Sequence, residues 1–273
     1  MSCSSAYRLL DVGGTFIKCA GGGQVPVPSG GSREEIAAAL QEAVGPADGL
    51  KGVGIAIPGP FDFRKGIFLM EHKFRSVYGI PFRELVSLPE QVELRFHHDV
   101  NALLRGAIRM LDLEKEDSAV VTLGTGLGFA HALEGQVRYN EMGSPALNIW
   151  NIPIPGGGVL EDRISARGLR AAYARKTGEE SPDVSAIADI ARKGGQAALE
   201  VFSEMGTELG MYLRDILGEL HIGTLLLGGQ ISRSMDLFAA PLGDALDGVR
   251  ILPAPEGAVF EGLSSLFDNE QNL

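Results

Sequence analysis

Short apolar runs separated by glycine turns occur twice along the chain, once near the N-terminus and once in the middle. The predicted strands are Tyr7–Val12, Thr15–Ala20, Gly52–Ile57, Glu93–His97, Ala119–Leu123, Phe129–Leu133 and Thr224–Leu227. Two hairpins follow from the turns: Gly13-Gly14 joins the first two strands, and Gly124–Gly128 joins the fifth and sixth. This repetition predicts an α/β fold of two similar lobes with a cleft between them.

Segments of helical period fill much of the remaining chain. Ser32-Arg33-Glu34-Glu35 is a capping box, which predicts a helix that runs to about Val44. The further predicted helices are Asp99 to about Asp112, Leu160–Thr177, Val184–Lys193, Ala197–Leu220, Ser234–Ala245 and Ala258–Phe267. The polar stretch Asp112–Ser118 is the predicted lobe boundary. We expect residues 1–112 and the C-terminal helix, about 257–273, to form the first lobe, and residues 113–256 the second.

Composition and charge exclude several classes of function. The 273 residues include 35 acidic and 24 basic residues, which gives a net charge of −11. A chain this acidic is poorly suited to bind nucleic acid or anionic lipid, which attract basic surfaces. No apolar run is long enough to span a membrane and no signal-peptide pattern is present, so a cytoplasmic protein is expected. The two cysteines, Cys3 and Cys19, exclude a disulfide framework and a cysteine-rich metal site.

Glycine is unusually frequent, with 37 residues, and three glycine turns follow predicted strands. They are Asp11-Val12-Gly13-Gly14-Thr15, Gly124-Thr125-Gly126-Leu127-Gly128 and Leu227-Gly228-Gly229. Backbone N–H groups and a threonine hydroxyl in such turns can bind phosphate, although for any one turn taken alone an ordinary tight hairpin is the favoured interpretation. Because a carboxylate repels phosphate, we interpret Asp11 as a magnesium-side residue and Lys18 as a counter-charge to phosphate. Neither a Rossmann nor a Walker motif is present.

Asp99 stands where a predicted strand meets a predicted helix, in His97-His98-Asp99-Val100-Asn101. A carboxylate at this junction can orient a hydroxyl group and accept its proton. The alternative is that Asp99 only caps its helix, and the two roles are compatible. The adjacent histidines lack a third ligand at a useful spacing, so a structural role is favoured over a metal site.

Seven segments, in the same order along the chain, resemble motifs of the ROK (repressor, open reading frame, kinase) sugar kinases of the actin-like ATPase superfamily. They are DVGGT at Asp11–Thr15, GIAIPGPFDFRKG at Gly54–Gly66, HDVNALLRG at His98–Gly106, LGTGLG at Leu123–Gly128, NEMGS at Asn140–Ser144, LEDRISARGL at Leu160–Leu169 and LLGGQIS at Leu226–Ser232. The resemblance extends over nearly the whole chain. It implies a two-lobed actin-like ATPase (ribonuclease H-like) fold with an interlobe cleft.

The resemblance also implies a glucokinase-like activity, in which ATP with Mg²⁺ phosphorylates a hexose or hexose derivative. Asp99 would be the general base, and His98, Glu141, Ser144 and Glu161 would join it in the sugar site. The residues implied for ATP and phosphate are Asp11 (toward Mg²⁺, through water), Gly13, Gly14, Thr15, Lys18, Gly124, Thr125, Gly126, Gly128, Gly228 and Gly229. Family members are often homodimers, which the composition neither requires nor opposes.

The chain departs from the family pattern at the zinc loop. The stretch SPALNIWNIPIPGGGVLE contains no Cys and no His, and Ser144 stands where the resemblance expects a His that binds zinc and sugar. We therefore expect no structural zinc, and we expect Trp150, Ile152 and Ile154 to hold the loop by apolar packing. His98 replaces the Asn that the family carries before the catalytic Asp, so two sugar contacts are altered.

The residues leave three classes of function open. An ATP-dependent sugar kinase is favoured, because the acidic residues and the phosphate turns are all retained. The alternative is a catalytically silent ROK-type regulatory protein that binds sugar or nucleotide. A DNA-bound repressor is disfavoured, because the first phosphate motif begins at Asp11, where family repressors carry a winged helix-turn-helix, and because the chain is acidic. A heat-shock-like ATPase fits poorly, because such chains are longer and lack the two sugar-site glutamates. The sequence does not name the sugar.

Overall fold

The computed structural model describes residues 6–270, and the chain divides into two compact units. Unit 1 contains the chain up to Asp112, Tyr139–Ala146 and the residues from Glu256 onward, and unit 2 contains Leu113–Arg138 and Leu147–Pro255. Tyr139–Ala146 therefore belongs to unit 1, although the sequence led us to expect it in the second lobe. Cys3 lies outside the described residues.

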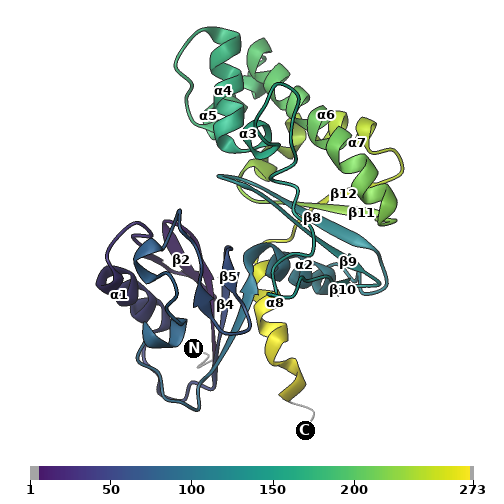
Figure 1. Ribbon diagram of the computed structural model, residues 1–273. Helices are drawn as coiled ribbons and strands as arrows, with labels where there is room; N and C mark the ends of the chain where they lie inside the picture. Colours follow the sequence, from purple (N-terminus) through teal and green to yellow (C-terminus); the bar gives the residue numbers. More distant parts are fainter. Residues whose placement is uncertain (1–5, 271–273) are drawn as a thin grey trace. The chain divides into compact units, whose positions relative to one another are not determined.

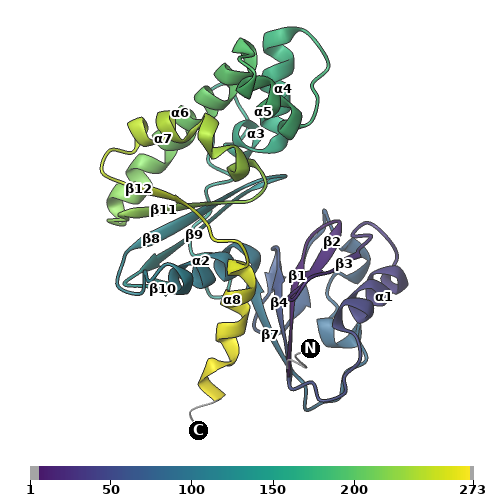
Figure 2. The same ribbon diagram turned by 180° about the vertical axis from the view of Figure 1, so that it is seen from behind.

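Unit 1 is built on a five-stranded mixed sheet in the order β3-β2-β1-β4-β7 (Figures 1 and 2). Its strands are β1 (Tyr7–Val12), β2 (Phe16–Cys19), β3 (Gln24–Pro26), β4 (Gly52–Ile57) and β7 (Glu93–His98). β1 pairs antiparallel with β2 and parallel with β4, and β4 pairs parallel with β7. The three parallel strands consequently end at the same edge of the sheet.

Helices cover both faces of this sheet. They are α1 (Arg33–Val44), α2 (Asp99–Met110) and α8 (Ala258–Ser264), and η4 (Ser265–Glu270) continues α8 as a 3₁₀ helix. α1 begins with the expected capping box at Ser32. Because side chains alternate along a strand, Val53 and Ile55 of β4 pack in the cluster that contains residues of α1, whereas Ala56 packs with Leu263 of α8. The sheet is thus buried between two apolar layers.

α2 and α8 approach each other backbone to backbone. A Cβ at Gly106 of α2 would collide with the carbonyl oxygen of Ala258, and a Cβ at Gly262 of α8 would collide with that of Ala102. The two glycines therefore permit a contact that no larger residue allows, and they hold the C-terminal helix against the helix that begins at Asp99.

An aromatic layer occupies the connection between β4 and β7. It contains the short hairpin β5 (Phe61–Asp62) and β6 (Ile67–Phe68) and the 3₁₀ turns η1 (Arg75–Val77) and η2 (Phe82–Glu84). The fully buried rings of Phe61 and Phe68 meet edge to face, with centroids 5.2 Å apart. The sequence did not predict these short elements, nor β3, β10 and β12, because each is too short for a periodic signal.

Unit 2 repeats the sheet of unit 1 in the order β10-β9-β8-β11-β12. Its strands are β8 (Ser118–Leu123), β9 (Leu127–Leu133), β10 (Gln136–Val137), β11 (Thr224–Gly228) and β12 (Arg250–Pro253). As in unit 1, the first three strands along the chain pair antiparallel, β8 with β9 and β9 with β10. The last two strands pair in parallel, β11 with β8 and β12 with β11. The predicted fold of two similar α/β lobes is confirmed.

Two predicted helices of unit 2 are each divided in two. The helices are α3 (Glu161–Ile164), α4 (Ala166–Thr177), α5 (Val184–Arg192), α6 (Gln196–Glu219), η3 (Ile231–Leu237) and α7 (Ala239–Ala245). Between α3 and α4, Ser165 is extended, with ψ 170°, and the Ala166 amide donates to the carbonyl oxygen of Gly124 at 2.8 Å. The break between η3 and α7 is explained by Pro241 in the first turn of α7: it has no N–H to donate, and in a continuous helix its ring would clash with the carbonyl group four residues earlier.

The loop that precedes α3 is anchored by isoleucines. Ile149 and Ile154 are buried, and Ile152 packs partly buried against the core of unit 2. The Trp150 side chain is 44% exposed, so the prediction that its ring packs the loop is wrong. Its backbone holds the loop instead, because the Trp150 carbonyl oxygen accepts a hydrogen bond from the Glu161 amide at 3.1 Å.

Within residues 6–270, none of the helices combines the length and the apolar character that crossing a membrane requires.

Candidate active site

Three connections of unit 1 meet at the edge where its parallel strands end. They are the Gly13-Gly14 turn after β1, Pro58-Gly59-Pro60 after β4, and Asp99 after β7. The register places Asp11 opposite Ala56, and Ile57 opposite His98. Ligands of open α/β sheets bind at the carboxyl ends of the strands. This edge is therefore the candidate active site of unit 1.

The Asp99 carboxylate is held by two donors. Its Oδ1 accepts a hydrogen bond from the Val100 amide at 2.7 Å and lies 2.8 Å from Nδ1 of His98. Burial favours the neutral acid, but His98, the Val100 amide and the charge of Lys73 outweigh it, so the pKa of Asp99 is lowered. Because 44% of the side chain is exposed, an ionised carboxylate is accessible to a substrate hydroxyl.

Asp99 is not the cap of its helix. The N-cap of α2 is His98, and Asp99 occupies the first helical position. Its carboxylate bonds the amide of the next residue, Val100, rather than an amide two or three residues further on. The interpretation of Asp99 as an N-cap and nothing more is therefore wrong.

Asp11 lies on β1 directly before the first glycine turn. Lys18 is its partner on β2, with Nζ 3.4 Å from Oδ2, and 20% of the Asp11 side chain is exposed. Burial raises the pKa of Asp11; Lys18 lowers it in part, and the negative charge of Asp99 raises it. The two carboxylates therefore repel each other, and a nearby cation would relieve that repulsion.

This arrangement fits Mg²⁺ better than a metal held by protein ligands alone. Among residues 6–270, no group of three or more His, Cys, Asp or Glu side chains could enclose a metal ion. Mg²⁺ is commonly held by one or two carboxylates together with water and substrate phosphates. Asp11 offers one such carboxylate beside a glycine turn.

Lys73 is a candidate site residue that the sequence did not predict. Its side chain lies against the first glycine turn, and a Cβ at Gly14 would be 3.4 Å from its Nζ. Two hydrogen bonds through Ser29 fix this approach. The Phe74 amide donates to the Ser29 carbonyl oxygen, and the Ser29 hydroxyl donates to the Gly14 carbonyl oxygen, each at 2.6 Å. Nothing in the spacing of Lys73 along the chain indicates this contact, because tertiary packing alone brings the two segments together.

The NEMGS segment forms a tight turn in unit 1. Oδ1 of Asn140 accepts hydrogen bonds from the amides of Met142 and Ser144, both at 3.0 Å, and the Asn140 amide donates to the Ser144 carbonyl oxygen at 2.9 Å. Glu141 is exposed at the tip of this turn. Glu141 and Ser144 are thus displayed on a rigid backbone.

The same turn is attached to elements that carry the candidate site. The Phe63 amide, which follows β5, donates to the Met142 carbonyl oxygen at 3.2 Å. Nδ2 of the buried Asn101, on α2, donates to the Gly143 carbonyl oxygen at 3.5 Å. A Cβ at Gly143, where φ is +84°, would be 2.9 Å from Cβ of Phe63. These contacts explain why the segment belongs to the unit that contains Asp99.

The two glycine turns of unit 2 also share one edge of a sheet. β8 leads into the second turn, and its parallel neighbour β11 ends at Gly228, which pairs with Thr122, so that Gly229 alone of the predicted pair follows the strand. A Cβ at Gly229, where φ is +85°, would collide with the carbonyl oxygen of Leu123. Gly128 is not part of the turn, since β9 begins at Leu127 and Gly128 pairs with Thr122. The predicted phosphate turn is therefore shorter, at Gly124–Gly126.

Glu161 supports the second glycine turn. Its Oε2 accepts a hydrogen bond from the Leu127 amide at 2.9 Å, and a Cβ at Gly126 would be 2.9 Å from the same oxygen. Glu161 starts α3 in unit 2, whereas Glu141 belongs to unit 1. The structure thus ties Glu161 directly to the second glycine turn.

His97 is a buried residue beneath the site. Its ring stacks on that of Tyr139, with centroids 5.4 Å apart, and only 8% of the residue is exposed. Burial lowers the pKa of His97 to about 4, and the charge of Arg105 acts in the same direction. His97 is therefore neutral at physiological pH.

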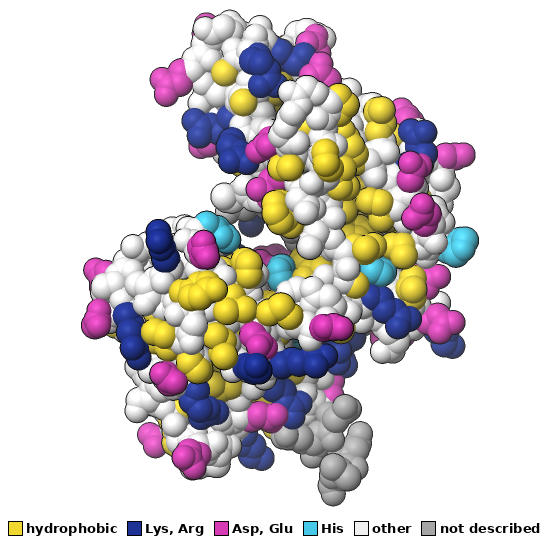
Figure 3. All heavy atoms as spheres, viewed as in Figure 1, with side chains coloured by type: hydrophobic (Ala, Val, Ile, Leu, Met, Phe, Trp, Pro, Cys, Tyr) yellow, Lys and Arg dark blue, Asp and Glu magenta, His cyan; other side chains and the backbone are white. Residues whose placement is uncertain are grey.

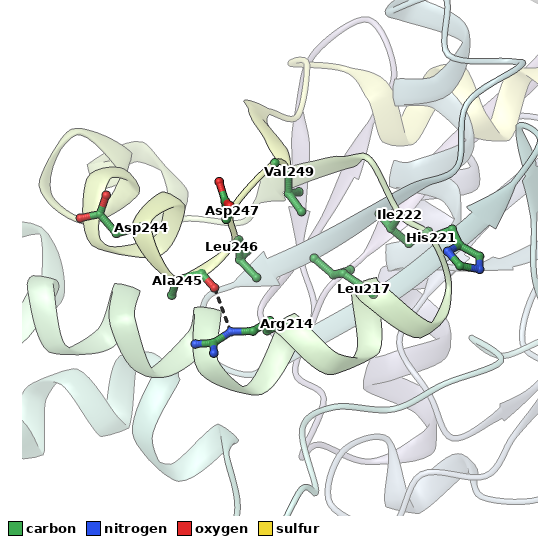
Figure 4. Close-up of a pocket in the computed structure, with 11 residues that line it drawn as sticks. Arg214, Leu217, His221, Ile222, Asp244, Ala245, Leu246, Asp247 and Val249 are labelled. Carbon is green, nitrogen blue, oxygen red and sulfur yellow. Dashed lines mark hydrogen bonds between the residues drawn. The ribbon is translucent and has the colours of Figure 1, made fainter.

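A hollow of about 640 Å³ in unit 2 lies apart from the glycine turns (Figure 4). On its wall, Nε of Arg214 donates to the Ala245 carbonyl oxygen at 3.1 Å. Of its residues, Val249 directly precedes β12, and Ile222 lies two residues before the start of β11. The hollow is therefore at the amino ends of these strands, opposite the edge that carries Gly228-Gly229.

Charged side chains of both signs are interspersed on the face drawn in Figure 3. Several basic residues form ion pairs, including Arg192 with Asp236 at 2.8 Å and Lys176 with Glu204 at 2.7 Å. These cations are partly neutralised by their neighbours.

The duplicated sheet, with a glycine turn after the first strand of each copy, defines the two-lobed actin-like ATPase fold. A sequence model of the ROK family matches residues 10–249, and the chain belongs to this family. A search of the curated proteins found no match.

Solved structures of ROK proteins share the fold. A ROK family glucokinase from Streptomyces griseus, in complex with glucose and AMPPNP, is 23% identical with a TM-score of 0.77 over 94% of this chain and 97% of that one. A ROK family protein from Streptococcus pneumoniae, in complex with sucrose, is 22% identical with a TM-score of 0.78 over 98% and 99%. A ROK family transcriptional regulator, a homologue of the E. coli MLC protein, is 16% identical with a TM-score of 0.76 over 97% and 82%. The fold thus occurs in sugar kinases and in regulators.

Proposed function

We propose that this protein is an ATP-dependent sugar kinase that phosphorylates a hydroxyl group of a hexose or hexose derivative. The observation that carries the proposal is the Asp99 carboxylate, held by the Val100 amide and His98 at the same sheet edge as Asp11 and the first glycine turn. The glucose and AMPPNP bound by the Streptomyces griseus glucokinase support a sugar as acceptor and ATP as donor.

Asp99 acts as the general base. The acceptor oxygen attacks the γ-phosphorus while its proton passes to the Asp99 carboxylate, and the bond to the bridging oxygen breaks to release ADP. Phosphoryl transfer requires mainly that the reactants are positioned and that the phosphate charge is neutralised. One well-placed base that accepts the hydroxyl proton is therefore the only proton-transfer group the reaction needs from the protein. The lowered pKa of Asp99 keeps the carboxylate deprotonated at neutral pH, which a general base requires before it can accept a proton.

The phosphates are bound by the glycine turns. Backbone N–H groups of Gly14, Thr15, Thr125, Gly126 and Gly229 are the donors in this proposal, and Lys18 and Lys73 add positive charge. The N–H groups of Gly13 and Gly124 close the turns themselves, because they donate to the carbonyl oxygens of Phe16 and Gly126. When bound, Mg²⁺ offsets the charge of the phosphates, and Asp11 would hold it through water. The repulsion between Asp11 and Asp99 supports a cation at this point.

The acceptor sugar is bound through Glu141, Ser144 and Glu161. Carboxylate oxygens accept hydrogen bonds from ring hydroxyls, and they suit a neutral sugar better than one that already carries phosphate, because like charges repel. The rigid Asn140 turn supports this role for Glu141 and Ser144.

The proposal is tested by incubating the protein with ATP, Mg²⁺ and a panel of neutral hexoses, N-acetylhexosamines and hexose phosphates, while ADP release is recorded. We expect release above the sugar-free background with at least one neutral sugar. A parallel arm with polyphosphate tests the donor. Sugar or nucleotide binding by calorimetry without any sugar-dependent ADP would contradict the kinase and favour the silent regulatory protein.

A further inference from the structure

Both ring nitrogens of His98 face polar groups of the candidate site. Nδ1 lies 2.8 Å from Oδ1 of Asp99, and Nε2 lies 3.3 Å from the amide nitrogen of Gly59. An amide N–H can only donate, so Nε2 accepts its hydrogen bond, and the proton of the neutral ring is on Nδ1. The Val100 amide is also 3.4 Å from Nδ1, but its hydrogen bond goes to Asp99 at the shorter 2.7 Å. Nδ1–H is therefore free to donate to the carboxylate.

The position of the ring is fixed by its surroundings. Only 18% of the His98 side chain is exposed, and its ring lies 5.7 Å from that of Phe63. A Cβ at Gly59 would be 3.3 Å from Nε2, so a glycine permits the close approach of the donor amide. The chain of hydrogen bonds runs from the end of β4, through the end of β7, to the first residue of α2.

We propose that His98 is a positioning residue for Asp99: the Gly59 amide orients the imidazole, and its Nδ1–H orients the carboxylate toward the acceptor hydroxyl. This inference rests on the proposed function for the role of Asp99. It replaces the expectation that His98 contacts the sugar, because both ring nitrogens are already engaged. It also explains how His can stand where the family resemblance predicts Asn, since both side chains present an N–H donor.

The groups that act on Asp99 show what the loss of His98 would change. His98, the Val100 amide and Lys73 favour its ionised form, whereas burial opposes it. Without the imidazole, the carboxylate keeps the hydrogen bond from the Val100 amide but loses the second donor, so its orientation is no longer fixed from both sides. A reacting group that is displaced by about 1 Å can lose about 10²-fold in rate.

Two variants separate positioning from sugar binding. His98→Phe keeps an aromatic ring against Phe63 but removes both nitrogens, and His98→Asn restores one N–H donor. We expect His98→Phe to lower kcat by about 10- to 100-fold with little change in the sugar KM, and His98→Asn to recover most of the loss. Equal thermal unfolding midpoints show that the variants are folded. A higher KM at unchanged kcat would assign His98 to the sugar instead, and unchanged kinetics would overturn the proposal.

The tautomer is tested without any catalytic assay. In ¹⁵N NMR spectra of histidine-labelled protein at neutral pH, His98 is identified by the signal that is lost in His98→Phe. We expect this signal to report a proton on Nδ1 and none on Nε2. A proton on Nε2 would overturn the positioning role, whether or not the protein is a kinase. Conversely, an Nδ1 proton in a protein that phosphorylates no sugar would contradict only the proposed function.

Discussion

Replacing Asp99 with asparagine distinguishes a general base from a residue that only stabilises its helix. The amide side chain of Asp99→Asn would keep the shape of the carboxylate and an oxygen that accepts from the Val100 amide, but it could not take a proton. A negative charge in the first turn of a helix contributes about 0.3–1 kcal/mol, and the 44% exposure of the side chain favours the lower end. The loss of a general base lowers turnover by about 10²–10⁴, which corresponds to about 3–5.5 kcal/mol of activation free energy. The kinetic effect should therefore exceed the loss of stability several-fold.

The assay measures kcat and KM with the best sugar of the panel, and the free energy of unfolding by denaturant, for each variant. Asp183→Asn is the matched control, because Asp183 is a true N-cap: its Oδ1 accepts from the Ala186 amide at 2.9 Å at the start of α5. Asparagine caps as well as aspartate, so this variant should keep its kcat. Near-normal turnover of Asp99→Asn would refute the general base, and a loss of activity matched by an equal loss of stability would indicate a structural role.

Three further predictions concern the supports of the site. Asn140→Ala should raise the sugar KM by about 2- to 10-fold, since a solvent-exposed hydrogen bond contributes about 0.5–1.5 kcal/mol; Asn140→Asp keeps the acceptor oxygen and should change KM less. Gly106→Ala should lower the unfolding free energy by about 1–3 kcal/mol in a denaturant titration, whereas Gly218→Ala, in a helix with nothing within 4 Å of its Cβ, should be neutral or stabilising. His97 stays neutral in the folded state down to about pH 4, but in the unfolded chain it protonates at about pH 6.5. The free energy of unfolding should therefore decrease by up to about 3 kcal/mol as the pH falls from about 6.5 to about 4. Urea titrations at several pH values measure this decrease, which should be smaller for His97→Phe.

Much of the framework of the site could be predicted from local sequence. The strand that ends at His98, the helix that starts at Asp99 and the glycine turns after β1 and β8 are all encoded by neighbouring residues. Buried positions recur every two residues in a strand and every 3.6 residues in a helix, so the spacing of apolar residues along the sequence predicts these elements. The same signals failed where a helix was interrupted, as at Ser165, because a tertiary hydrogen bond to Gly124 competes there with the helical one.

What the residue order determined, then, is which side chains stand at strand ends and beside glycine turns. Only the tertiary structure decided which of them meet: it brought Lys73 to Gly14, attached the Asn140 turn to α2, and gave His98 to Asp99 and Gly59 rather than leaving it open to a ligand. The physical reason is that a contact between distant segments depends on strand register and packing across the whole unit, and a short stretch of sequence carries no record of either.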